Sequence, residues 1–218
     1  SLRFFLLSSA PLGQNYRFSE RLLAHTFRNV IMRFYNCYLF LDYTAKTYKI
    51  NSFKRPRKLH FLDKWIIALL EKTTQEVVGL MENYELVKAA RKIEDFIAEL
   101  SLWYVRRVKS LIKDKNSATA KLYILSQVLK KFSILSAPFL PYLSEIIFQK
   151  LREEKDPISV HLCQIETTQK PELDVLERME LIREAVSDLL ELRSKAKIKV
   201  RQPLAAAYLP FSVTQEEA

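Results

Sequence analysis

Residues 84–112 read YELVKAARKIEDFIAELSLWYVRRVKSLI, the best-patterned segment of the sequence. Its apolar residues recur at spacings of three and four, which places them on one face of a helix with 3.6 residues per turn. This stripe consists of Leu86, Ala90, Ile93, Ile97, Leu100, Tyr104, Val108 and Leu111. Amphipathic helices bury such a stripe, so the stretch predicts a long helix whose apolar face lies in the core.

The same spacing predicts helices over residues 19–45, 61–81, 118–136, 141–154 and 171–197. Ser19 is placed to cap the first of these, and Pro141 stands at a first-turn position, where its missing N–H costs nothing. Only two glycines occur in 218 residues, too few for the turns of an all-β chain. We therefore predict an all-α fold, an antiparallel bundle of about five or six helices.

Two segments instead resemble extended chain. DPISVHLC, residues 156–163, alternates apolar and polar residues and predicts a short strand. IKVRQPL, residues 198–204, predicts a short extended C-terminal appendage that shows Lys197, Lys199 and Arg201 on one side. The chain accordingly divides into a linker over 1–18, a helix bundle over 19–155, and an extended segment, final helix and basic junction over 156–218.

Charge and composition narrow the class of partner and the compartment. The formal net charge is +10, which favours an acidic partner such as nucleic acid or an anionic surface. Residues 46–58 form a loop with six basic residues and no acidic one, although that charge could serve solubility alone. No run approaches a membrane span, and the two cysteines are too few for a disulfide framework. A cytoplasmic protein is the simplest expectation.

Residues suited to catalysis are scarce in this sequence. The three histidines lie far apart, and none has a partner at metal-ligand spacing. Gly13 and Gly79 cannot build a phosphate-cradling loop, and no serine is flanked by the glycines of a nucleophile elbow. We predict no catalytic residue and no metal site.

The stretch LWYVRRVK, residues 102–109, sets a large aromatic ring beside clustered cations. In one interpretation, Trp103 packs at the core edge next to a solvated cationic face. In the other, the cations hold a polyanion while the ring meets an exposed base. Arg106, Lys109 and Lys113 follow at spacings of three and four, so they share a helix face, although cations near a helix C-terminus are also favoured by its dipole.

Several motifs together resemble isoleucyl-tRNA synthetases. They occur in the same order as in that family and cover almost the whole chain: SLRFFLLSS, LDKWI, LWYVRRVK, APFLPYLSEIIFQKL, SVHL and IKVRQPL. The APFLPYLSE pattern is shared with the valyl and leucyl relatives, whereas the Arg-Arg pair after WYV and the KVRQPL tail look isoleucyl. The matching part of the family is the segment that follows the catalytic domain.

The resemblance implies an all-helical anticodon-binding domain of a class I synthetase. Its partner would be the anticodon arm of isoleucine-accepting tRNA, and it would act as a monomer in contact with its own catalytic domain. The adenylate-forming signatures of the family are absent from this sequence, so no cofactor is expected here, and ATP and Mg would belong to the parent catalytic domain. A valyl or leucyl assignment and a helical protein-interaction scaffold are the alternatives; a complete small enzyme would need a site that the sequence does not show.

This implication ranks the candidate tRNA-binding residues. Arg106, Arg107 and Lys109 come first, with Lys113 beside them, because arginine suits bidentate phosphate contacts and lysine binds phosphate as a point charge. Trp103 is a candidate for base stacking, and Arg107 could instead pair with a neighbouring helix. Lys197, Lys199 and Arg201 come second, because the junction after this bundle approaches the anticodon in the family, and the loop over 46–58 comes third.

Overall fold

A computed structural model describes residues 2–9, 18–167, 170–206, 208–209 and 211–212. Within these ranges every regular element is helical. The elements are α1 Leu2–Ser9, α2 Glu20–Thr26, the π-helical turn η1 Phe27–Met32, α3 Arg33–Thr47, α4 Phe61–Glu82, α5 Leu86–Ala98, the π-helical turn η2 Glu99–Val105, α6 Arg106–Leu111, α7 Lys115–Ser136, α8 Pro141–Leu151, the 3-10 turn η3 Val160–Leu162 and α9 Leu173–Lys195. The all-α prediction is confirmed.

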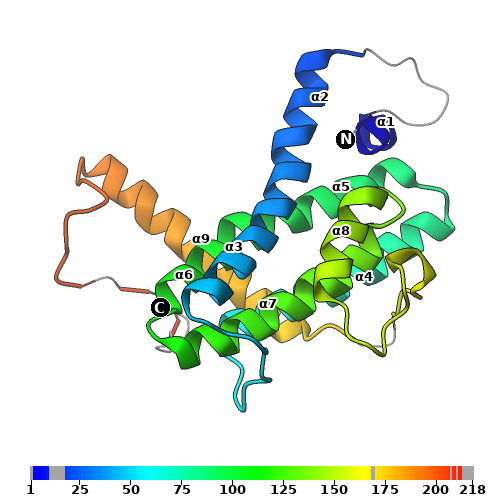
Figure 1. Ribbon diagram of the computed structural model, residues 1–218. Coiled ribbons are helices and arrows are strands. Elements are labelled where there is room, and N and C mark those ends of the chain that lie inside the picture. Colours follow the sequence, from blue (N-terminus) through cyan, green and yellow to red (C-terminus); the bar gives the residue numbers. More distant parts are fainter. Residues whose placement is uncertain (1, 10–17, 168–169, 207, 210, 213–218) are drawn as a thin grey trace.

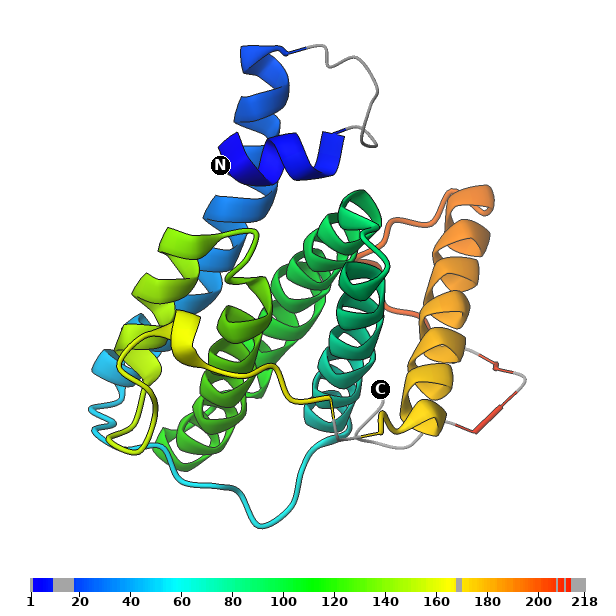
Figure 2. The same ribbon diagram turned by 90° about the vertical axis from the view of Figure 1, so that its right-hand side faces the viewer.

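The helices pack as a bundle around one main core (Figure 1). α4 and α5 form an antiparallel hairpin that turns at Tyr84, whose φ of 58° lies in the left-handed region. α3 lies along α7, α8 packs back on α7, and α9 lies against α4, as the turned view shows (Figure 2). Short connections join α4 to α5 and α7 to α8, as in helix bundles generally.

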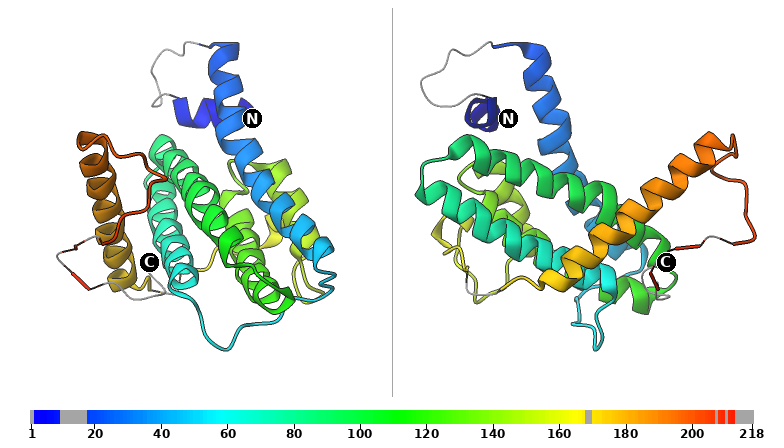
Figure 3. Two further views of the ribbon diagram at one scale, coloured as in Figure 1. Left: turned by 90° about the vertical axis from the view of Figure 1, so that its left-hand side faces the viewer. Right: turned by 180° about the vertical axis from the view of Figure 1, so that it is seen from behind.

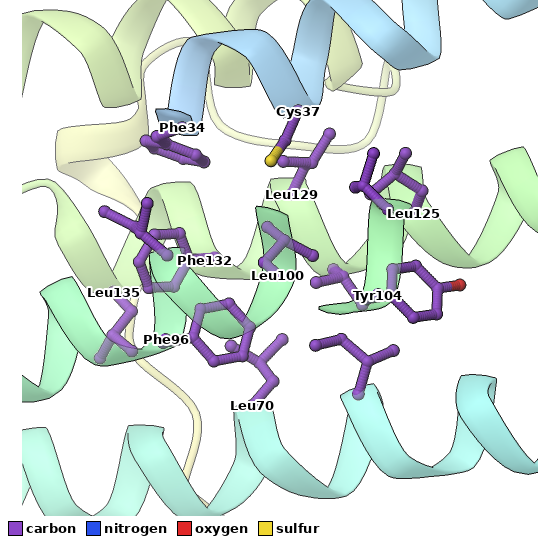
Figure 4. Packing of buried hydrophobic residues seen from close by; sticks show 14 of the residues in the cluster. Phe34, Cys37, Leu70, Phe96, Leu100, Tyr104, Leu125, Leu129, Phe132 and Leu135 are labelled. Atoms are coloured by element: carbon purple, nitrogen blue, oxygen red, sulfur yellow. The ribbon is translucent and has the colours of Figure 1, made fainter. Parts of the chain in front are cut away.

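The predicted stripe of residues 84–112 forms the centre of this core. Ala90, Ile93, Ile97, Leu100, Tyr104 and Val108 are all fully buried. Phe96 of the same stretch lies 4.6 Å, centroid to centroid, from Phe132 of α7, which in turn meets Phe34 of α3 edge-on at 5.0 Å (Figure 4). Three helices distant in sequence are therefore joined through one aromatic cluster.

The long helix is continuous but not uniformly α-helical. Backbone dihedrals stay in the right-handed helical region from α5 through η2 into α6, and the wider π-helical turns occupy Glu99–Val105. A π-helical turn holds more residues than an α-helical one, so it rotates the following side chains about the axis. The predicted helix from residue 19 likewise contains a π-helical turn, and Ser19 stands at its N-cap position without a side-chain capping bond.

The N-terminal residues 2–9 are more than a simple linker. They form α1, which packs against α5, and Phe4 is fully buried in the main core, 6.5 Å from the ring centroid of Phe139. The division of the chain at residues 18 and 155 remains a prediction.

The predicted strand over residues 156–163 is wrong. Residues Val160–Leu162 form the turn η3, and the described part of the chain offers no strand beside it. The carboxylate of Glu145 explains the turn, because its Oε2 accepts hydrogen bonds from Ser159 Oγ at 3.0 Å and from the Val160 amide at 2.8 Å. Val160 is buried beside Phe148 while Ile158 and Leu162 are exposed, so the alternation does not define a buried face.

Candidate nucleic-acid interface

Four exposed cations gather where the long helix ends. Arg106, Arg107 and Lys109 lie on α6, and Lys113 follows in the connection to α7, two residues past the last helical residue. The prediction that Lys113 continues the helical face therefore fails, although it stays beside the helix end. Within the described ranges no carboxylate lies within ion-pair distance of any of the four. Their charge is available to an external polyanion.

The Trp103 ring lies at the edge of the core. It is partly buried, and two guanidinium groups lie near its ring, that of Arg107 at 4.6 Å from the centroid and that of Arg183 at 4.1 Å. Arg183 comes from α9, also lies 5.1 Å from the Trp65 ring, and forms an ion pair with Glu99 in which its Nη1 is 3.2 Å from Oε1. Trp103 thus helps to join α9 to the bundle, and base stacking on it stays a prediction.

Arg107 does not pair with a neighbouring helix in the described structure. Its guanidinium lies over Trp103, four residues earlier on the same continuous helix, and its side chain is exposed. Lys109 does reach a neighbour, since its Nζ lies 5.3 Å from the centroid of the Phe40 ring on α3. Cation–π contacts of this kind orient a cation without neutralising it, so both remain suited to phosphate.

A buried polar network fixes the π-helical turn beneath these cations. Tyr104 donates a hydrogen bond from its hydroxyl to Asp63 Oδ1 at 2.9 Å, and Lys121 donates to Asp63 Oδ2 at 2.6 Å. Burial and, next, the negative charge of Asp63 raise the pKa of Tyr104 well above its usual value. The phenol therefore remains a neutral donor, and it anchors the residue directly after Trp103 to α4 and α7.

The three basic residues after α9 do not line one side of an extended chain, so that prediction is wrong. Lys197 has a φ of 55°, and the Gln202 amide bonds the Lys199 carbonyl at 2.9 Å, which closes a turn. The guanidinium of Arg193 stabilises this turn by donating a hydrogen bond to the Lys199 carbonyl at 2.7 Å. All three cations, Lys197, Lys199 and Arg201, are exposed.

This C-terminal turn is separate from the α6 cations. α9 packs against α4, and its C-terminal half projects beyond the bundle (Figure 3). Lys197, the residue after the C-cap Ala196, is left-handed, and backbone bonds from Lys197 and Ile198 hold the helix end, so the turn is a compact end of the helix rather than an arm. The structure therefore brings the first group of candidates together and leaves the second group apart.

The basic loop is confirmed as a non-helical connection between α3 and α4. Lys46 still belongs to α3 and pairs with Asp42 at 2.7 Å, so its charge is partly satisfied. Ile50 is buried in the core and fixes the loop to the bundle, while Lys49, Lys54, Arg55, Arg57 and Lys58 are exposed.

The described residues contain no group of three or more histidine, cysteine or acidic side chains that could hold a metal ion. His60 caps α4, accepting the Leu62 amide on Nδ1 at 3.2 Å, and His25 lies 2.7 Å from Asn29. Burial raises the pKa of the Cys37 thiol to about 12, so it stays protonated and unreactive. None of the helices described is long and apolar enough to cross a membrane.

Fold and surface together define an all-helical module that presents unpaired cations at one helix end. The model of the family described as the anticodon-binding domain of tRNA ligases matches residues 63–208 of this chain. The chain belongs to that family. The matched region runs from Asp63 through α6 and into the turn after α9, so it includes all eight candidate tRNA-binding residues.

Similar proteins include three isoleucine–tRNA ligases. That of Chlamydia trachomatis is 34% identical and covers 100% of this chain, which in turn spans 22% of the relative. That of Protochlamydia amoebophila is 33% identical over 96% of the chain, and that of Dehalococcoides mccartyi is 34% identical over 94%, each across 21% of the relative. The chain thus spans about a fifth of the length of these relatives.

Proposed function

We propose that this chain binds the anticodon arm of a tRNA and that the tRNA accepts isoleucine. The observation that carries the proposal is the group of exposed, unpaired cations Arg106, Arg107, Lys109 and Lys113 inside a region that matches an anticodon-binding family. Similarity to isoleucine–tRNA ligases along the whole chain supports the choice of amino acid.

The geometry suits a phosphate backbone. Arginine offers a planar fork of donors for two phosphate oxygens, and the neutralisation of each phosphate releases condensed counterions. Arg107 is oriented by the Trp103 ring and Lys109 by Phe40, so less conformational freedom is lost when they bind. Because the network of Asp63 fixes the helix beneath them, the cations are presented at set positions rather than on a mobile tail.

This role is one of positioning. We propose that the catalytic part of the full-length ligase activates isoleucine with ATP and Mg and transfers it to the tRNA. We also propose that this ligase is a monomer in the cytoplasm. Basic residues on a helical bundle would then bring the tRNA to that catalytic part. Valyl and leucyl ligases are the nearest alternatives, because they share the APFLPYLSE pattern.

Binding to purified isoleucine, valine and leucine tRNAs over a series of salt concentrations tests the proposal. We expect the tightest binding to isoleucine tRNA and a steep fall of affinity with salt. Equal affinity for all three tRNAs would contradict the isoleucine assignment. Affinity that does not depend on salt would contradict the proposed phosphate contacts.

A further inference from the structure

A cleft of about 970 Å³ lies between the loop that follows α3 and the first turns of α7. The loop is the cyan segment that hangs below the bundle in Figure 1. Five exposed cations line the cleft, four from the loop and one from the helix, and no acidic residue does. They are Lys49, Lys54, Arg55, Arg57 and Lys115.

The charge of this cleft is not neutralised within the described part of the chain. None of the five cations has a carboxylate within ion-pair distance, in contrast to Lys46 just before the loop, which pairs with Asp42. The nearest acidic neighbour in sequence, Asp114, caps α7, and its Oδ1 accepts the Ser117 amide at 2.8 Å. Like charges gathered in a cleft repel one another, so an anionic ligand that enters relieves that repulsion.

The other lining residues indicate which part of a nucleic acid fits. Asn51, Ser52 and Asn116 bring amide and hydroxyl groups, which hydrogen-bond phosphate oxygens and ribose hydroxyls. The hydroxyl of Thr119 donates to the Lys115 carbonyl at 2.8 Å, so it can only accept a hydrogen bond, as from a ribose hydroxyl. No aromatic ring lines the cleft, so it lacks the surfaces on which unpaired bases stack. The chemistry suits a sugar-phosphate backbone and not a particular base.

We propose that this cleft binds the sugar-phosphate backbone of RNA, independently of sequence, as a second contact beside the α6 cations. Lys113 and Lys115, two residues apart, connect the two surfaces along the chain. An RNA backbone bound at the α6 cations would therefore continue into the cleft. The proposal rests on the proposed function for its choice of tRNA, but not for the cleft's affinity for RNA.

The test uses the triple variant K54A/R55A/R57A in the full chain. Its control is K72A/R91A/K150A, which removes the same charge from exposed basic residues of α4, α5 and α8 outside the cleft. Both are titrated with an isoleucine tRNA transcript and with an unrelated RNA hairpin, at 50 and 200 mM salt. Circular dichroism and thermal melting establish that each variant is folded.

We expect the cleft variant to lose affinity for both RNAs and to lose salt dependence. Three phosphate contacts, each contributing about 0.7–0.9 to the salt slope, make the wild-type affinity fall about 20- to 40-fold more than that of the variant between the two salt concentrations. The control variant should lose much less affinity for either RNA, since its three cations lie on separate helices and do not line one binding surface.

The failures of the two proposals differ. If the cleft variant behaves like the control with both RNAs while wild-type tRNA binding remains specific, the cleft proposal is overturned and the proposed function stands. If the cleft variant binds both RNAs more weakly but the wild type does not prefer tRNA, the cleft proposal is supported and the proposed function is overturned. Loss of tRNA binding with unchanged hairpin binding would overturn the assignment to backbone.

Discussion

The Nζ of Lys121 lies 2.6 Å from Oδ2 of Asp63, an ion pair between α7 and α4 whose two side chains are both buried. The same carboxylate accepts the Tyr104 hydroxyl and, at 3.2 Å, the His60 amide at the start of α4. One acidic side chain thus connects α4, α7 and the π-helical turn that precedes the α6 cations. Asp63 has enough partners for a charge that burial alone would make costly.

Asp63→Ala should lower the free energy of unfolding by about 3–5 kcal/mol, because it leaves the Lys121 ammonium buried without a partner. Urea unfolding followed by circular dichroism measures this. Asp42→Ala is the matched control, since its pair with Lys46 is largely exposed and should contribute less than about 1 kcal/mol. Equal losses in the two variants would show that the network does not hold the bundle together.

Trp103→Ala should weaken the packing of α9 on the bundle without changing the net charge of the protein. It removes the ring under the Arg183 guanidinium, so we expect a loss of about 2 kcal/mol, between a cation–π contact and a fully buried aromatic ring. Hydrogen exchange along α9 should rise with the lower melting temperature. Arg107→Ala, which removes the exposed guanidinium on the same ring, should stay within about 0.5 kcal/mol.

The opposite result would support base stacking. A Trp103→Ala protein that melts normally but binds tRNA weakly would mean that the ring contacts a base, a contact worth about 1–3 kcal/mol. The salt slope should stay unchanged in either case, because neither a ring packed at the core edge nor a stacked base adds a phosphate contact.

Periodicity predicted the helices well where local pattern and tertiary packing agree. The second helix was predicted over 61–81 and extends over Phe61–Glu82, and the stripe of residues 84–112 is buried almost throughout. The π-helical turns were not predicted, because a spacing of three and four is compatible with both helix types. The choice between them depends on packing, such as the bond of Tyr104 to Asp63 across 41 residues.

Several of the failures and omissions have the same cause, namely partners distant in sequence. The alternation around Val160 suggests a strand, but Glu145 on α8 bonds the backbone there and makes a turn. The basic loop over 46–58 is visible in the sequence as a third candidate, but the cleft is not, because α4, α5, η2 and α6 separate the loop from Lys115 along the chain. Arg183 was also overlooked, since only the structure places it between Trp103 and Glu99.

The turn at Val160 should weaken in acid. Burial raises the pKa of Glu145, but hydrogen bonds from Gln149, Val160 and Ser159 outweigh it and hold the pKa below its usual value. A carboxyl group with a lowered pKa in the folded state contributes stability that is complete above its unfolded pKa, about 4.3, and is lost as pH falls through the folded value. The contribution should therefore be present at pH 7 and disappear below about pH 4.

Glu145→Gln isolates this contribution, since glutamine does not titrate. The difference in free energy of unfolding between the wild type and this variant should be largest near neutral pH and should narrow as the pH is lowered. Urea unfolding at a series of pH values measures it. A difference that stays constant from pH 7 to pH 3 would show that ionised Glu145 is not favoured by the fold.

The double variant R106A/K109A tests the α6 cations directly. If both side chains hold phosphates, tRNA affinity should fall and the salt slope should flatten by about 0.7–0.9 for each lost contact. Stability should change little for Arg106, which is exposed, so its single variant should remain within about 0.5 kcal/mol of the wild type. Lys150→Ala on α8, another exposed cation, is the control and should leave the slope unchanged. If R106A/K109A binds with unchanged affinity and slope, α6 does not face the tRNA, and the contact must lie at the cleft or at the turn of Lys197, Lys199 and Arg201.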